Sequence, residues 1–194
     1  MSEPVITRPL SPPLSAEHAL MSMAVALAPD EGWAFSLVSL VSDSLNSPEQ
    51  VRADYPRWLD VPSWSNHELA REALLTALTG NLWALEPLVA GFDWRASAQQ
   101  IHRGLRQLFL SPLATWEPDP RDDYAEPDPD AAAPYLRKAA RRSRAAGMAL
   151  FSIDIGDSFT LGFVRSDRAD LLVSDAARAG YTRATDQIFR LVDG

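Results

Sequence analysis

Apolar residues recur at helical spacing through the first part of the chain. Ser15 is followed by an apolar stripe on one helical face, which ends before Pro29 and Gly32. The stripe consists of Ala19, Leu20, Met23, Ala24 and Leu27. Residues 33–45 fit either a buried helix or a strand, and the three-to-four spacing of their apolar positions favours the helix. The proline-rich residues 1–14 are expected to form a mobile lead.

Two capping boxes predict the starts of further helices. Residues 47–50 (Ser-Pro-Glu-Gln) offer a capping Ser, a Pro at the first helical position and a Gln three residues after the Ser. Residues 65–68 (Ser-Asn-His-Glu) form the second box, and Gly80 supplies the end of its helix. Residues 81–94 are apolar enough to be substantially buried, but a proline and a glycine exclude a long helix there. Another amphipathic helix follows, with the apolar positions Ile101, Leu105, Leu108 and Phe109.

The last quarter of the chain has a β-β-α-β pattern. Two apolar strands are predicted at residues 148–155 and 159–164, joined by a Gly-Asp-Ser turn at 156–158. Ser166 is placed to cap a helix, and residues 187–192 form a closing strand. The predicted fold class is therefore α+β, with a helix-rich N-terminal two-thirds that covers one face of a small antiparallel sheet.

The composition changes abruptly between these two parts. Residues 117–130 contain seven acidic residues and four prolines, which leaves too little apolar surface to fold alone. We expect an acidic, proline-rich loop at 117–134 within a single compact domain over residues 15–194. The next helix carries five cations, Arg137, Lys138, Arg141, Arg142 and Arg144. Internal pairing with the acidic loop, or plain solvation, is favoured over nucleic-acid binding, because no aromatic residues alternate with these cations.

The overall composition narrows the class of protein. The 194 residues carry 18 Lys and Arg against 26 Asp and Glu, a net charge of −8, and contain no cysteine. The acidic balance argues against nonspecific nucleic-acid binding, and the lack of cysteine excludes disulfides and thiolate metal sites. The chain shows neither a secretory signal nor an apolar stretch of about 20 residues, so we expect a cytoplasmic protein with no membrane association.

The Gly-Asp-Ser triplet is the feature closest to a catalytic motif. It is similar to the start of the Gly-Asp-Ser-Leu esterase motif, but no histidine follows Ser158 and the next residues alternate as in a strand. Asp154 and Asp157 flank the turn, and paired carboxylates can hold a divalent cation, although a role in the turn itself is favoured. The three histidines lack metal-ligand spacing and no phosphate-binding glycine motif is present, so we assign no catalytic residue, metal or cofactor.

A second candidate surface is the proline-bracketed connection that contains Trp58 and Trp64, where a recognition loop can lie. The candidate binding residues are thus Asp154, Asp157, Ser158, Trp58 and Trp64.

The segments 88–94 (Leu-Val…Phe-Asp-Trp) and 150–159 (Leu-Phe-Ser-Ile-Asp…Gly-Asp-Ser-Phe) resemble a family of uncharacterised bacterial proteins. The resemblance implies a helical region before two strands joined by a turn, and it implies no established activity. Some families of similar size and gene context neutralise bacterial toxins, which is an analogy only.

Two functions follow as hypotheses. The first is a non-catalytic protein-interaction or regulatory module, for example of the immunity type, whose partner is another protein. The second is a hydrolase that uses Asp154, Asp157 and Ser158 in the hairpin. The sequence leaves the oligomeric state open.

Overall fold

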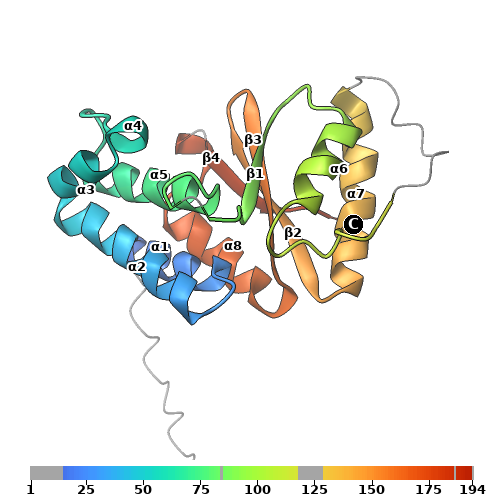
Figure 1. Cartoon of the computed structure of the whole chain (residues 1–194), viewed down its shortest axis with the longest axis horizontal. Helices are drawn as coiled ribbons and strands as arrows, with labels where there is room; N and C mark the ends of the chain where they lie inside the picture. The colour runs from blue at the N-terminus through green and yellow to red at the C-terminus, as the bar shows by residue number, and fades with distance from the viewer. Residues whose placement is uncertain (1–14, 84, 118–128, 186, 194) are drawn as a thin grey trace, which may run out of the picture.

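The computed structural model describes residues 15–83, 85–117, 129–185 and 187–193, which form eight α-helices, two short 3-10 helices and a four-stranded sheet within these ranges (Figure 1). The helices are α1 (Ala16–Leu27), α2 (Glu31–Asn46), α3 (Pro48–Asp54), α4 (Pro56–Leu59), α5 (Asn66–Leu78), α6 (Ala98–Arg106), α7 (Pro129–Ala145) and α8 (Ala169–Arg178). The strands are β1 (Val89–Asp93), β2 (Met148–Ile155), β3 (Ser158–Arg165) and β4 (Gln187–Leu191). The 3-10 helices are η1 (Ser166–Arg168) and η2 (Arg183–Thr185).

Local capping explains several of the helix starts. The hydroxyl of Ser15 accepts from the backbone of His18, and Ser65 and Glu68 form the reciprocal capping box of α5. Residues 33–45 are helical within α2, which confirms the favoured alternative. Ser47 precedes α3 but its side chain makes no capping bond, so the box expected at 47–50 is absent, although Pro48 does start the helix.

The sheet has the strand order β1-β3-β2-β4, and its described neighbours all pair antiparallel. The three C-terminal strands lie where the sequence predicts them. Residues 81–94, expected to be buried without a long helix, contribute β1, whose Val89 pairs with Gly162 of β3. Gly162 is needed there, because a Cβ on it would lie 2.6 Å from Phe151 Cζ and 2.8 Å from Val89 Cγ1.

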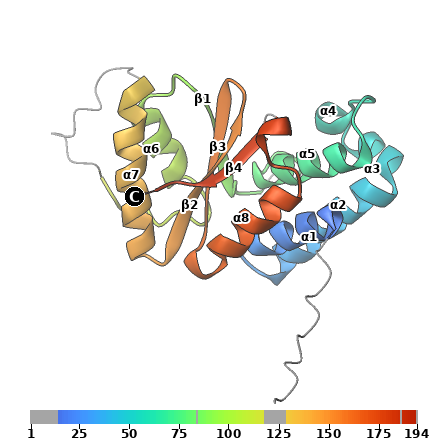
Figure 2. The same ribbon diagram turned by 180° about the vertical axis from the view of Figure 1, so that it is seen from behind.

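Helices cover both faces of the sheet, which corrects the expectation that they cover one. Figures 1 and 2 show α6 and α7 on one side and α1, α2, α5 and α8 on the other. Successive residues of β2 point to opposite sides, so Phe151 and Ile153 join the larger core while Leu150 joins the smaller one with Leu161 and Phe163. The result is a three-layer arrangement of helices, sheet and helices.

The helix α7 begins at Pro129 and includes Pro134, so residues 129–134, expected to belong to the acidic loop at 117–134, are helical. Residues 118–128, together with the expected lead at 1–14, lie outside the described residues. At the C-terminal β-α connection, Ser166 is the first residue of the 3-10 turn η1, and the N-cap of α8 is Arg168 rather than the expected Ser166. No helix within the described ranges combines the length and apolar character needed to cross a bilayer.

Candidate functional site

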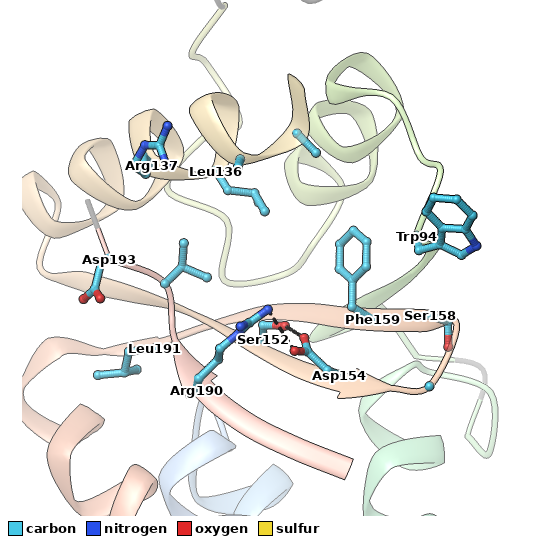
Figure 3. Close-up of a pocket in the computed structure, with 14 residues that line it drawn as sticks. Trp94, Leu136, Arg137, Ser152, Asp154, Ser158, Phe159, Arg190, Leu191 and Asp193 are labelled. Atoms are coloured by element: carbon cyan, nitrogen blue, oxygen red, sulfur yellow. Dashed lines mark hydrogen bonds and ion pairs between the residues drawn. The ribbon is translucent and has the colours of Figure 1, made fainter. Parts of the chain in front are cut away.

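A cavity of about 530 Å³ lies between α7 and the sheet, on the side that carries α6 and α7 (Figure 3). We call it the sheet cleft. Residues from α7, β2, β3 and β4, the β2–β3 turn and the segments after β1 and β4 line it: Trp94, Ala132, Ala133, Leu136, Arg137, Ser152, Asp154, Gly156, Ser158, Phe159, Arg190, Leu191, Val192 and Asp193.

A fixed polar group forms part of the cleft floor. Ser152 and Asp154 lie two residues apart on β2, so both side chains point to the same face of the sheet. The hydroxyl of Ser152 donates to Asp154 Oδ1 over 2.6 Å, and Arg190 Nη2 lies 2.8 Å from Asp154 Oδ2. Each carboxylate oxygen therefore has one partner, and the Asp154 side chain remains 26% exposed.

Apolar side chains form the rest of the site. Leu136 projects from α7 toward the sheet, and Phe159 projects from β3 toward the helices (Figure 3). The Phe159 ring packs against Phe92 at 5.7 Å between centroids. Trp94 stands at the rim with 44% of its surface exposed, and the Arg95 guanidinium lies 4.6 Å from the centre of its indole ring.

The Gly-Asp-Ser triplet reverses the chain between β2 and β3, as the sequence analysis favours. Ile155 pairs with Ser158, which leaves Gly156 and Asp157 as the two turn residues, and Gly156 has a positive φ of 56°. The Ser158 hydroxyl donates to the Ile155 carbonyl oxygen over 3.1 Å. None of the histidines lines the sheet cleft, so no imidazole stands beside Ser158 among the described lining residues.

The five candidate binding residues separate in the structure. Asp154 and Ser158 both line the sheet cleft, and Asp157 is exposed on the adjoining turn, where its carbonyl accepts from the Trp94 backbone over 3.2 Å. Trp58 belongs to α4 at the opposite end of the molecule, and Trp64 packs partly buried against the larger core. The described residues contain no group of three or more His, Asp or Glu side chains arranged to hold a metal ion.

The site also contains Ser152, Arg190 and Trp94, which are not predicted from the sequence. The spacing of Ser152 and Asp154 on a strand was a usable signal, because alternation places both on one face. The contribution of Arg190 depends on the pairing of β4 with β2, which no local pattern specifies.

A polar cluster beside the smaller core connects α6 with α7. His102 Nδ1 lies 3.1 Å from the Tyr135 hydroxyl, and Trp116 stacks on the Tyr135 ring. Burial lowers the pKa of His102 below its usual value, against an opposing effect from Glu117, whose carboxylate also pairs with Arg106. This cluster lies outside the lining of the cleft and connects α7, which forms one of its walls, to α6.

The comparison with protein families finds a match, which includes most of the residues that line the sheet cleft. The family model described as a domain of unknown function, DUF6630, matches residues 19–187. The chain belongs to the DUF6630 family. This confirms the resemblance to an uncharacterised family, while a bacterial origin stays a prediction. The DUF6630 match includes Trp94, Leu136 and Asp154 and ends before Arg190. No curated protein and no solved structure matches the chain.

Two polar side chains of the site have partners within the protein. The Asp154 carboxylate is engaged by a hydroxyl and a guanidinium, and the Ser158 hydroxyl is engaged by a backbone carbonyl. An apolar wall beside a few fixed polar groups is typical of a pocket that orients a ligand.

Proposed function

We propose that the protein is a non-catalytic protein-interaction module that binds a segment of a partner protein in the sheet cleft. The observation that carries the proposal is the combination of Trp94, exposed at the rim, with the fixed Ser152–Asp154–Arg190 group inside. A large exposed aromatic residue beside a pocket is the usual anchor of a protein interface.

Each part of the cleft has a distinct role in this proposal. An apolar side chain of the partner packs against Leu136 and Phe159, and its removal from water favours binding. Asp154 retains further lone pairs on both oxygens, so it accepts a hydrogen bond from the partner while Ser152 and Arg190 hold it in place. The net charge of −8 favours encounter with a basic partner and affects the association rate more than the affinity.

Capture of partners from the native host by the full chain tests the proposal, with two matched variants. Arg190→Glu places a second acid beside Asp154 in the cleft. Arg165→Glu is the control, because Arg165 is similarly exposed (63% against 64%) and also pairs with a nearby acid, Asp167, but lies outside the cleft.

We expect one reproducible partner that binds wild type and Arg165→Glu and is lost with Arg190→Glu. Equal retention by both variants contradicts binding in the cleft. Coexpression of the identified partner with the wild-type chain then tests the immunity type, which requires that toxicity of the partner be suppressed. Ester or phosphoester hydrolysis by the wild type that Asp157→Asn abolishes would support the hydrolase instead.

A further inference from the structure

A second cavity, of about 560 Å³, lies on the opposite half of the molecule between α2, α3 and the connection that follows α5. We call it the α2–α3 groove. Its lining residues are Phe35, Ser36, Ser39, Leu40, Asp43, Ser47, Gln50, Val51, Asp54, Tyr55, Trp83 and Leu85. None of them belongs to the sheet cleft.

Two large apolar side chains stand exposed at one end of the groove. Phe35 is 75% exposed and Leu85 is 48% exposed, although they come from segments fifty residues apart. Single exposed apolar residues are common on protein surfaces and need no explanation. Two that line one cavity together with Trp83 form an anchor site of the kind that interfaces use.

The floor of the groove is held in place by contacts of its aromatic residues. The Trp83 indole nitrogen donates to the Tyr55 hydroxyl over 3.3 Å, and the Trp83 ring packs edge-on against Trp33 at 6.0 Å. Leu40 and Val51 are buried beneath. The groove is therefore preorganised, which lowers the entropic cost of binding.

The other end of the groove is acidic. Asp43 on α2 and Asp54 on α3 are both exposed, and no Lys or Arg is among the described residues that line the groove. Phe35, Ser39 and Asp43 follow one another at intervals of four along α2, so they form one stripe. The stripe is about 12 Å long, since a helix rises about 1.5 Å per residue.

We propose that the α2–α3 groove binds an amphipathic, cationic helix of a partner protein, with an apolar side chain between Phe35 and Leu85 and its Lys or Arg side chains against Asp43 and Asp54. The charge complementarity selects this occupant, because a cationic segment is attracted to the two exposed carboxylates and an acidic segment is repelled by them. Asp54 accepts a hydrogen bond from Gln50 Nε2 over 2.7 Å, which orients its carboxylate without neutralising the charge. The proposal concerns a separate surface and does not depend on ligand binding in the sheet cleft.

Two synthetic peptides of about 15 residues, long enough to form a helix, test the proposal with the full chain. One combines Leu anchors at helical spacing with Lys on the opposite face, and the other carries Glu at every Lys position. Calorimetry measures their binding to wild type, to Phe35→Ser, to the double variant Asp43→Asn with Asp54→Asn, and to two controls, Leu171→Ser and Trp94→Ser. Leu171 is the matched control because it is 52% exposed on α8, away from the groove.

We expect the Lys peptide to bind wild type and the Glu peptide not to bind. Phe35→Ser should weaken binding about tenfold or more, as loss of a hot-spot aromatic does, while Leu171→Ser should leave it within about twofold. The double Asn variant should abolish most of the salt dependence of binding. Circular dichroism of each variant verifies that it is folded.

Three results overturn the proposal. The first is no measurable binding of the Lys peptide at about 1 mM, a concentration that detects even weak interactions. The second is an equal effect of Phe35→Ser and Leu171→Ser, which indicates nonspecific attraction to an acidic protein. The third is loss of binding with Trp94→Ser, which places the peptide in the sheet cleft.

Discussion

Arg190 contacts Asp154 diagonally across the ladder between β4 and β2. The register pairs Arg190 with Ser152, and Asp154 with Ile188, yet the guanidinium reaches 2.8 Å from the Asp154 carboxylate. The Arg190 side chain therefore lies beside Ser152 and reaches the Asp154 carboxylate, two residues further along β2 on the same face of the sheet. This arrangement presents Asp154 to the cleft in a single orientation.

The Arg190–Asp154 pair should order the cleft while adding little to the stability of the fold. Both side chains are accessible to water, so we expect a coupling free energy below about 1 kcal/mol in a double-mutant cycle of Arg190→Gln and Asp154→Asn. Urea unfolding measures it. A coupling above about 2 kcal/mol would mean that the pair supports the fold, as a buried pair does.

Gly162 should be intolerant of any side chain. Its Cβ would enter the space of Phe151 and Val89 in the larger core, so Gly162→Ala should lower the free energy of unfolding by about 1–3 kcal/mol. Gly91→Ala is the control, because the nearest atom to its Cβ is Thr160 Oγ1 at 3.9 Å. Thermal unfolding of both variants provides the comparison, and equal stability would contradict the close packing of β1, β2 and β3.

The two serines that precede helices should differ in their contribution to stability. Ser65 accepts from the Glu68 backbone in a complete capping box, so Ser65→Ala should cost about 1 kcal/mol. Ser47 makes no side-chain capping bond, and Ser47→Ala should leave the denaturation midpoint nearly unchanged. A larger loss of stability for Ser47→Ala than for Ser65→Ala would contradict these capping contacts.

The buried His102 should make stability depend on pH. Burial lowers the pKa of His102 in the folded chain below its usual 6.5, so below that pH the unfolded chain binds a proton that the folded chain does not. Stability should therefore fall as the pH drops below 6.5. His102→Gln removes this contribution, so the stability advantage of the wild type over this variant should shrink between pH 7.5 and about 5.5. A stability advantage of the wild type that grows as the pH falls from 7.5 to about 5.5 would contradict a lowered pKa of His102.

The parts of the fold that could be predicted correctly depend mostly on short sequence patterns. Ser15 and Ser65 each bond within three residues of themselves, so the helix starts depend on short stretches alone. The turn at 156–158 is likewise local, because its glycine adopts a positive φ that favours this residue type. The unbroken apolar run from Ala149 to Phe151 is typical of a strand buried on both faces, and it signalled the second helical layer that the sequence analysis missed.

Long-range pairing accounts for what could not be predicted. Val89 pairs with Gly162, so β1 exists because of a partner strand more than seventy residues away. The same applies to the cleft, where Trp94, Asp154 and Arg190 come from three separate strand regions. Candidate residues such as Asp154 were identifiable from their chemistry, but the residues that surround them in the folded protein were not.

Site-specific photocrosslinking tests the central claim, that a partner binds at the sheet cleft. A benzophenone amino acid replaces Trp94 at the cleft rim in one full-length variant and Trp58 on α4 in another, positions that are 44% and 38% exposed. Irradiation in native host extract should yield a single discrete adduct for position 94 and none for position 58. Adducts of equal yield at both positions, or at position 58 alone, would contradict the cleft as the binding site.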